Sequence, residues 1–254
     1  MPGYFDLNGR VALVTGASRG LGLAMAEALA HAGASVILNG RHSNTLKAAT
    51  DRIHDRGFIA EASVFDVTDH HATDAAIESI VARHRRLDIL IANAGVTHRA
   101  QLADWISEAW DTVLEANLKA CFFLAQAAAA PMRSQRHGRI IFTTSALGIL
   151  GRATVHAYAA SKSGLAGLTR SLAAELGEYG ITCNAIAPGY FETELTASLV
   201  ADKGFVARIN DRVPLRRWGK PHDLGGIAVF LASDAAAYVT AQQIVVDGGL
   251  STTM

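Results

Sequence analysis

The chain has no excess of charge of either sign, because 23 Lys and Arg residues balance 23 Asp and Glu residues over 254 positions. Proteins that bind nucleic acid or an anionic membrane surface usually carry a basic excess. The balanced composition therefore argues against both kinds of partner, and a small molecule is the expected ligand.

Cysteine is also scarce. Cys121 and Cys183 are the only two, and both lie in apolar segments where we expect buried, reduced thiols. No Cys/His spacing resembles a zinc site, so no metal is predicted. Reduced thiols are typical of the cytoplasm, which is the expected compartment.

Long apolar runs and proline-rich stretches are missing. The N-terminus lacks the charged head and apolar core of a signal peptide. The longest apolar run, residues 120–132, is interrupted by Gln126 and Pro131 and is shorter than the ~20 residues that cross a bilayer. The five prolines are too scattered to mark a boundary, so we predict one domain over residues 1–254.

Within that domain, short apolar runs alternate with longer amphipathic segments. Strands are expected at about 11–15, 35–39, 59–65, 87–93, 139–145, 182–187 and 243–247, and helices at about 20–32, 43–56, 70–85, 106–132, 155–178 and 221–232. Strands that alternate with helices form βαβ units, and strands that are apolar on both faces are covered by helices on both sides. The predicted fold is α/β, a doubly wound parallel sheet of the Rossmann type with about seven strands.

A glycine-rich turn follows the first predicted strand. The stretch TGASRGLG places Gly16, Gly20 and Gly22 between strand and helix, with Ser18, Arg19 and Leu21 among them. Such a turn lets a backbone approach closely, and the helix N-terminus behind it attracts a pyrophosphate. The spacing differs from the usual G-x-G-x-x-G. Its position after the first strand of a βαβ unit favours a dinucleotide site over a plain loop.

The end of the second strand predicts which dinucleotide is bound. NAD-binding proteins usually place an acid there, which accepts a hydrogen bond from the ribose 2′-hydroxyl. Here the strand ends in Asn39, Gly40 and Arg41, without a carboxylate. Arg41 and Arg19 could instead pair with a 2′-phosphate, so NADP is favoured over NAD. The alternative is that both arginines are solvated surface charges.

Two more loops fit the same cofactor. Asp66 follows the third strand and could accept from the adenine amino group, while Val67 packs on the ring. Asp66 could equally be a helix N-cap, as could Thr68 or Asp69. At the end of the fourth strand, the small residues Asn93, Ala94 and Gly95 would let a cofactor lie flat against the backbone.

The stretch YAASK places Tyr158 and Lys162 four residues apart, on one face of a predicted helix. With five tyrosines and five lysines in the chain, chance gives about 0.1 such pairs. An ammonium beside a phenol favours the phenolate, and such a phenol can act as general acid or base. The pair therefore indicates proton transfer.

Two companions belong with this pair. Ser145 lies at the end of the preceding strand, where doubly wound sheets bind their ligands, and its hydroxyl could donate to a substrate carbonyl. Asn117 lies inside a long predicted helix, where its propensity is poor. It could hold a water through which Lys162 relays protons, or it could be purely structural.

Together these residues resemble the short-chain dehydrogenase/reductase family over nearly the whole chain. The matching elements are TGxxxGxG at 15–22, NAG at 93–95, Asn117, Ser145, Tyr158, Lys162, PG…T at Pro188, Gly189 and Thr193, and the terminal VDGG at 246–249. One departure is Ala92, where the family often has Asn.

The resemblance implies hydride exchange between NADP(H) and a hydroxyl or ketone, with Pro188, Gly189 and Thr193 at the cofactor. Within the family, stretches such as APGYFETELTASLVADKGF and RRWGKP look most like gluconate 5-dehydrogenases. That likeness implies a sugar-acid substrate and a homotetramer. The 3-oxoacyl-carrier-protein reductases and polyol dehydrogenases share these stretches and stay as alternatives. A redox-sensing dinucleotide-binding module without catalysis would lack some of the catalytic residues. All four of them are present here.

A sugar acid needs a cation for its carboxylate. Arg99 follows the NAG turn, and Arg152 and His156 lie between Ser145 and Tyr158. We hypothesise that Arg99 holds the carboxylate with Arg152 or His156 at the rim, the alternative being surface arginines. Residues 190–216 are polar and helical between prolines, and we interpret them as a lid over cofactor and substrate, or else as a fixed surface helix pair.

Overall fold

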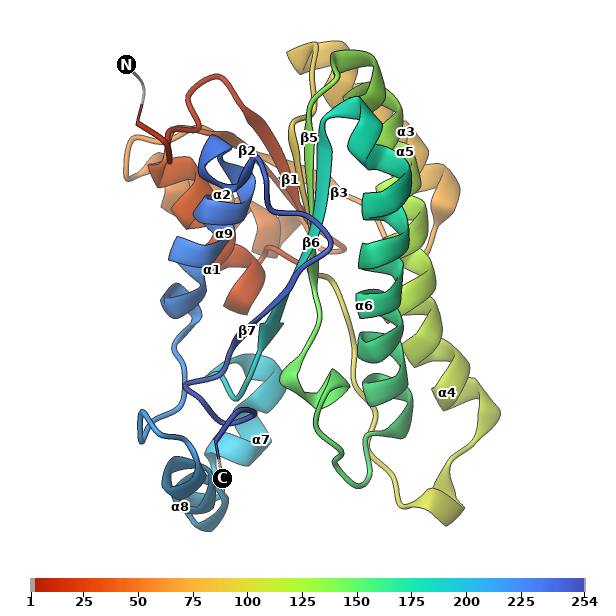
Figure 1. Ribbon diagram of the computed structural model, residues 1–254, viewed down its shortest axis with the longest axis vertical. Coiled ribbons are helices and arrows are strands. Elements are labelled where there is room, and N and C mark those ends of the chain that lie inside the picture. Colours follow the sequence, from red (N-terminus) through yellow and green to blue (C-terminus); the bar gives the residue numbers. More distant parts are fainter. Residues whose placement is uncertain (1–2, 254) are drawn as a thin grey trace.

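The computed structural model describes residues 3–253 of the chain, and its centre is one seven-stranded parallel sheet (Figure 1). The strand order is β3-β2-β1-β4-β5-β6-β7, and every neighbouring pair is parallel. The strands are β1 Val11–Val14, β2 Ser35–Gly40, β3 Ala60–Val64, β4 Ile89–Ala92, β5 Gly138–Thr143, β6 Ile181–Pro188 and β7 Gln243–Val246. The predicted doubly wound sheet is confirmed.

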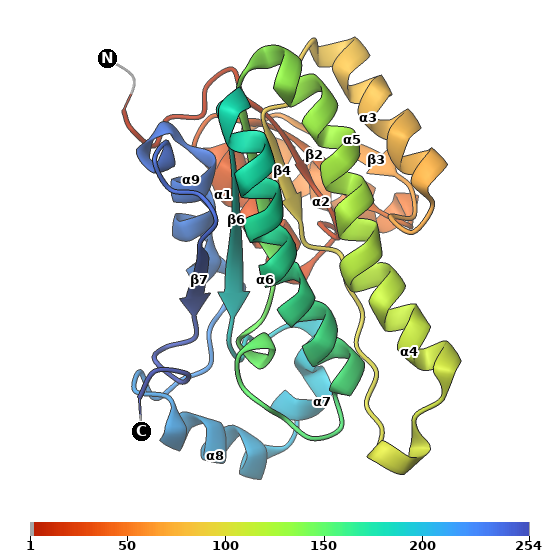
Figure 2. The ribbon, with the colours of Figure 1, turned by 45° about the vertical axis from the view of Figure 1, so that its right-hand side comes forward.

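Helices cover both faces of this sheet. They are α1 Gly20–His31, α2 Ser43–His54, α3 His70–His84, α4 Ser107–Leu114, α5 Ala120–Gln135, α6 His156–Leu176, α7 Ala197–Val200, α8 Lys203–Arg212 and α9 Gly225–Ala232. Helices α1, α2 and α9 pack on one face, and α3, α5 and α6 pack on the other (Figure 2).

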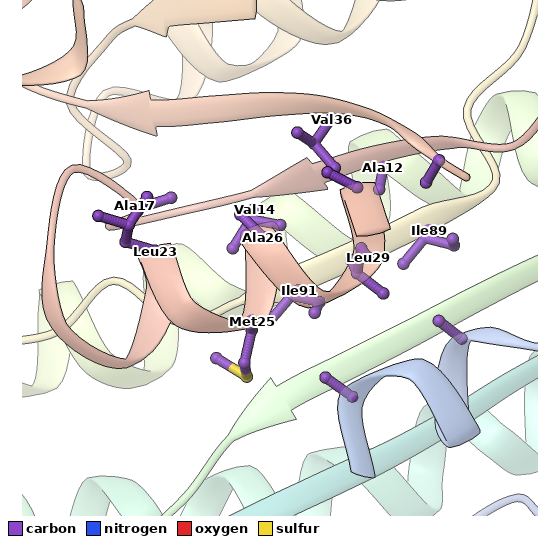
Figure 3. Close-up of a cluster of buried hydrophobic side chains, with 14 of the residues drawn as sticks. Ala12, Val14, Ala17, Leu23, Met25, Ala26, Leu29, Val36, Ile89 and Ile91 are labelled. Carbon is purple, nitrogen blue, oxygen red and sulfur yellow. The ribbon is translucent and has the colours of Figure 1, made fainter. Parts of the chain in front are cut away.

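Alternation along each strand divides the core between these two layers. In β1, Ala12 and Val14 face α1, whereas Val11 and Leu13 join the opposite cluster. Figure 3 shows the first cluster, in which Leu23 and other apolar side chains of α1 pack against strand residues. Burial on both sides explains why the inner strands are mostly continuous apolar runs in the sequence, whereas the edge strand β3 alternates between partly buried and exposed residues over most of its length.

The long predicted helix at 106–132 is where sequence and structure differ most. It consists of α4 and α5, joined by a turn of π-helix at Glu115–Lys119, and it continues to Gln135. By length and composition, Ser107–Gln135 is long and apolar enough to cross a membrane. In the structure this segment packs against the core, since Leu124, Ala128 and Met132 on its inner face are buried in the hydrophobic cluster on one side of the sheet.

The sheet reverses its winding between β1 and β4, which are neighbours in space. Ligands of doubly wound sheets bind beyond the carboxyl ends of the strands at such a point. The glycine turn leaves β1 there, and the segment 93–95 leaves β4 beside it. Helices α7 and α8 lie at the same end of the molecule, beyond the tips of β6 and β7 (Figure 2).

Candidate active site

The glycine turn is built to bring backbone close to backbone. Gly16 has a φ of +61°, and a Cβ at this position would lie 2.9 Å from the Cα of Ala94. A Cβ on Gly22 would lie 2.4 Å from the carbonyl oxygen of Gly16. Neither position admits a side chain without a shift. Ser18 and Leu21 lie in the same turn, and Arg19 occupies the N-cap of α1 without a side-chain capping bond.

Hydrogen bonds tie this turn to the loop after β4. The Thr15 hydroxyl accepts from the backbone N–H groups of Asn93 (3.0 Å) and Ala94 (3.1 Å). The Asn93 amide donates to the carbonyl oxygens of Thr15 (3.1 Å) and Gly16 (3.3 Å). Asn93 therefore acts as a brace for the turn. Thr15 shares that task, although the sequence argument gave it no role.

At the end of β2 the two polar residues divide into one buried and one exposed group. The buried Asn39 donates from its amide to the carbonyl oxygens of Ser63 (3.3 Å) and Phe65 (3.0 Å), so it joins β2 to the end of β3 and to the residue after it. The Arg41 guanidinium is exposed, with Nη1 3.9 Å from the Asp66 carboxylate. Two guanidiniums, Arg19 and Arg41, thus follow β1 and β2, and β2 ends without an acid.

Asp66 does not cap a helix. Its carboxylate accepts from the N–H (3.0 Å) and hydroxyl (2.8 Å) of Thr68. The Thr68 N–H is the largest cause that lowers the pKa of Asp66, and Arg41 adds a smaller effect. The N-cap of α3 is Asp69, which accepts from the N–H of Ala72 at 3.0 Å. Of the three capping candidates Asp69 is the one that the structure selects, and Val67 beside Asp66 is mostly buried.

Tyr158 and Lys162 share one face of α6, as their spacing predicts. The Lys162 ammonium lies 5.7 Å from the centre of the Tyr158 ring. It is buried, and it donates to the carbonyl oxygen of Thr143 at 2.7 Å, where β5 ends. Ser145 is buried two residues beyond that strand, and its hydroxyl oxygen accepts from the N–H of Leu147 at 3.1 Å.

The Asn117 side chain bonds to protein atoms through both its oxygen and its amide. Its oxygen accepts from the N–H of Val96 (2.8 Å), and its amide donates to the carbonyl of Val96 (2.9 Å) and to the Ser161 hydroxyl (3.2 Å). Ser161 donates in turn to the carbonyl oxygen of Tyr158 at 2.8 Å. Asn117 therefore fixes the loop after Gly95 against α6.

A cavity of about 390 Å³ opens beside these residues. Ser145, Tyr158, Pro188 and Gly189 line it, so the proposed acid and its companions face one space. Thr193 lies on the other side of this segment, where a Cβ on Gly20 would be 3.8 Å from the Thr193 Cβ. The stretch after β6 thus reaches from the cavity to the glycine turn.

Two of the three predicted substrate residues line the same cavity, namely Arg99 and Arg152. Burial lowers the pKa of Arg99, and the charge of Arg152 lowers it further. Arg152 donates from Nη1 to the Tyr190 hydroxyl at 3.3 Å. His156 is not among the residues that line the cavity, because its ring packs 5.9 Å from that of Trp105.

Two further arginines of the cavity, Arg208 and Arg212, escaped the sequence argument. They lie on α8, within the segment interpreted as a lid. The signal that could have found them is their spacing, since residues 205, 208, 209 and 212 recur on one side of a helix.

Comparisons with known proteins agree with this geometry. A family model described as enoyl-(acyl carrier protein) reductase matches residues 16–251. Gluconate 5-dehydrogenase of Gluconobacter oxydans (strain 621H) is 41% identical, over 100% of this chain and 99% of its own. The 3-oxoacyl-[acyl-carrier-protein] reductase of Escherichia coli (strain K12) is 40% identical, over 96% and 98%. The crystal structure of a gluconate 5-dehydrogenase from Burkholderia cenocepacia J2315 in complex with NADP and tartrate superposes with a TM-score of 0.96, at 42% identity, over 99% and 98%.

Proposed function

This chain belongs to the short-chain dehydrogenase/reductase family of oxidoreductases, and we propose that it interconverts a hydroxyl and a ketone of a sugar acid with NADP(H). One observation carries the proposal. Tyr158 and Ser145 face a cavity that also contains Arg99 and Arg152. A proton donor, a hydrogen-bond donor and two guanidiniums thus surround one space, as a carboxylate-bearing carbonyl substrate requires.

The glycine turn fits a dinucleotide. Gly16 and Gly22 have no room for a side chain, and the N–H groups at the start of α1 suit a pyrophosphate. The cofactor would be held by residues from six segments: Gly16, Ser18, Arg19, Gly20, Leu21 and Gly22; Asn39 and Arg41; Asp66 and Val67; Asn93, Ala94 and Gly95; Tyr158 and Lys162; and Pro188, Gly189 and Thr193.

The 2′-phosphate would pair with Arg41 and Arg19, because β2 ends without an acid to bind a free ribose hydroxyl. A relative that is 42% identical was crystallised with NADP, which supports NADP over NAD. NADP(H), when bound, supplies or accepts the hydride.

The chain's own residues handle the proton. In the reductive direction Tyr158 gives its phenolic proton to the carbonyl oxygen, while the Ser145 hydroxyl donates a hydrogen bond to that oxygen as charge develops. The Lys162 ammonium, held 2.7 Å from the Thr143 carbonyl, stabilises the phenolate that Tyr158 leaves behind. Asn117 keeps α6 and the loop at Val96 together, and the second lone pair of its side-chain oxygen would accept from the water of the proton relay.

Arg99 would hold the substrate carboxylate, with Arg152 beside it. Gluconate 5-dehydrogenase as a relative at 41% identity supports a sugar acid. Two guanidiniums at the cavity wall argue against a neutral polyol, which leaves both charges without a partner. A second candidate is reduction of a 3-oxoacyl thioester, since a reductase of that kind is 40% identical.

Three coarser features complete the proposal. Residues 190–216 would act as a lid, since Leu195, Phe205 and Ile209 of this segment form one wall of the cavity. Trp110 and Phe122 are exposed apolar side chains on α4 and α5, which supports assembly into a homotetramer. Two buried free thiols, Cys121 and Cys183, support a cytoplasmic location.

The test is a panel read at ~340 nm, the band of reduced nicotinamide. D-gluconate and 5-ketogluconate, D-sorbitol, and an acetoacetyl thioester would each be assayed with NADP(H) and with NAD(H). We expect the sugar acids to react fastest, with NADP(H). Faster reduction of the thioester would favour the second candidate, and preference for sorbitol would contradict the proposal.

A further inference from the structure

Four arginines line the cavity beside Tyr158, and no acid lines it with them. Arg99 and Arg152 come from the two loops around the active site, and Arg208 and Arg212 come from α8. Within residues 3–253, no Asp or Glu oxygen lies within 4.0 Å of any of the four guanidiniums. The cavity is therefore strongly cationic.

Arginines just outside the cavity do have carboxylate partners. Arg216 lies 3.9 Å from Asp211, and Arg217 binds Asp223 at 2.6 Å. In each pair a nearby carboxylate neutralises an arginine that follows α8. Among the described residues Arg208 and Arg212 have no such partner although they too are exposed, and what sets them apart is that they line one cavity with Arg99 and Arg152.

Two of the four arginines, from different segments, approach one aromatic ring. The guanidinium carbons of Arg152 and Arg208 lie 5.1 and 5.6 Å from the centre of the Phe205 ring. The charge of Arg152 also reaches Arg99, whose pKa it helps to lower. Charges from the loops and from α8 thus converge on the same space.

This convergence carries a small cost without a ligand. Arg208 and Arg212 stand four residues apart on the cavity face of α8, and like charges at that spacing destabilise a helix. Arg99 is in addition partly desolvated. A bound anion offsets both costs, so the arrangement favours a ligand with more than one negative charge.

We propose that the cavity binds a sugar acid with two anionic groups, and that Arg208 and Arg212 hold the second of them. This inference rests on the proposed function, in which Arg99 and Arg152 hold the first carboxylate. The second group is a carboxylate or a phosphate at the opposite end of the sugar acid from the first carboxylate. Both present oxygens that a guanidinium fork binds in pairs.

Charge matching separates this ligand from a sugar acid with one anionic group. One carboxylate has two oxygens and can satisfy at most two guanidinium forks. With the first carboxylate on Arg99 and Arg152, the pair on α8 has no partner. A second anionic group gives that pair one. Arg208 and Arg212 are therefore residues that set specificity, and the chemistry stays with Tyr158.

The test compares three alcohols with NADP: D-gluconate, with one carboxylate; D-glucarate, with a carboxylate at each end; and 6-phospho-D-gluconate, with a carboxylate and a phosphate. We expect kcat/KM of the wild-type enzyme to be at least about tenfold higher for one double anion than for D-gluconate. The preferred compound tells a carboxylate from a phosphate.

The Arg208→Gln/Arg212→Gln variant tests whether the two arginines of α8 cause the preference for a double anion. It should lose about tenfold to hundredfold in kcat/KM for the preferred double anion and less than about threefold for D-gluconate. The control is Lys203→Gln/Arg216→Gln, which removes two positive charges near α8 from residues that do not line the cavity. It should leave both values within about twofold.

Binding gives a readout that is independent of turnover. An alcohol and NADPH cannot react with each other, so calorimetric titration of each alcohol into the enzyme with NADPH measures affinity alone. The double substitution should raise Kd for the double anion about tenfold or more, and leave Kd for D-gluconate nearly unchanged.

The possible outcomes distinguish a failure of this inference from a failure of the proposed function on which it rests. Turnover of D-gluconate with no preference for a double anion, or equal losses for all three alcohols in the double variant, would overturn the inference alone. Turnover of none of the three would overturn the proposed function and this inference together.

Discussion

The Lys162 ammonium lies 5.7 Å from the centre of the Tyr158 ring and 2.7 Å from the carbonyl oxygen of Thr143. The second contact positions the first, because Thr143 is the last residue of β5 and is paired with β6 in the sheet. A lysine side chain is flexible in isolation. Here one hydrogen bond to the strand end holds its charge beside the phenol from which a proton is to be transferred.

Arg99 should act on anionic substrates through binding. We expect Arg99→Ala to raise KM for a sugar acid by about tenfold to hundredfold with a smaller change in kcat, because a charge-assisted hydrogen bond to the carboxylate is lost. Arg99→Lys keeps the charge and should recover part of the loss. An unchanged KM in Arg99→Ala would rule out the carboxylate role.

Arg41 should discriminate between cofactors. Its guanidinium is exposed near Asp66, where a 2′-phosphate can reach it. Arg41→Ala is expected to raise KM for NADPH by about tenfold and to leave KM for NADH almost unchanged. Lys47→Ala, on the exposed side of α2, is the control. Equal effects on both cofactors would place Arg41 outside the phosphate site.

Asn117 should matter for stability as well as for rate. Asn117→Ala leaves the N–H and carbonyl of Val96 without the partners they have now, 2.8 and 2.9 Å away. We expect a loss of about 2–3 kcal/mol in the free energy of unfolding, measured by urea titration, together with a lower kcat. Thr112→Ala, exposed on α4, should cost under about 0.5 kcal/mol. Full stability in Asn117→Ala would contradict the brace.

His137 predicts how stability depends on pH. Burial lowers the pKa of His137 to about 4, and the charges of Arg139 and Arg10 add to this effect. The Asp88 carboxylate lies 4.0 Å from the Nε2 atom of His137 and raises the pKa of His137 only in part. This carboxylate already accepts two hydrogen bonds of 2.6 Å from Arg86.

The unfolded chain binds a proton at His137 below about pH 6.5, whereas the folded chain does so only near pH 4. Between these values unfolding takes up a proton, so stability falls as pH falls. The full effect is about 2–3 kcal/mol at 1.36 kcal/mol per pH unit, after allowance for partial exposure. His137→Gln should weaken the pH dependence of the urea midpoint between about pH 6.5 and 4. An identical slope in both proteins would refute this assignment.

Much of the fold and of the candidate site could be predicted from the sequence because these features depend on local patterns. Most strands are short runs that are apolar on both faces, and the glycine turn follows the first of them, so the sheet and the place of the site could be predicted. Tyr158 and Lys162 share a face by spacing alone. The lowered propensity at Asn117 marked a real irregularity, which is the π-helical turn.

What the sequence could not supply depends on contacts between distant segments. Asn117 bonds to Val96, and Thr15 to Asn93, and neither partner is visible from composition. Arg208 and Arg212 read as surface charges in a polar helix until the fold turns that face toward the cavity. His156 shows the reverse case, since proximity in sequence to Tyr158 did not bring it to the cavity wall.

The central claim is that Tyr158 is the proton donor, and the most direct measurement compares Tyr158→Phe with the wild type in one assay of turnover and one of NADPH affinity. The variant removes a single oxygen and keeps the ring against Lys162. We predict that reduction of 5-ketogluconate falls by at least about a thousandfold while Kd for NADPH stays within about threefold. A variant that turns over at the wild-type rate would contradict the account.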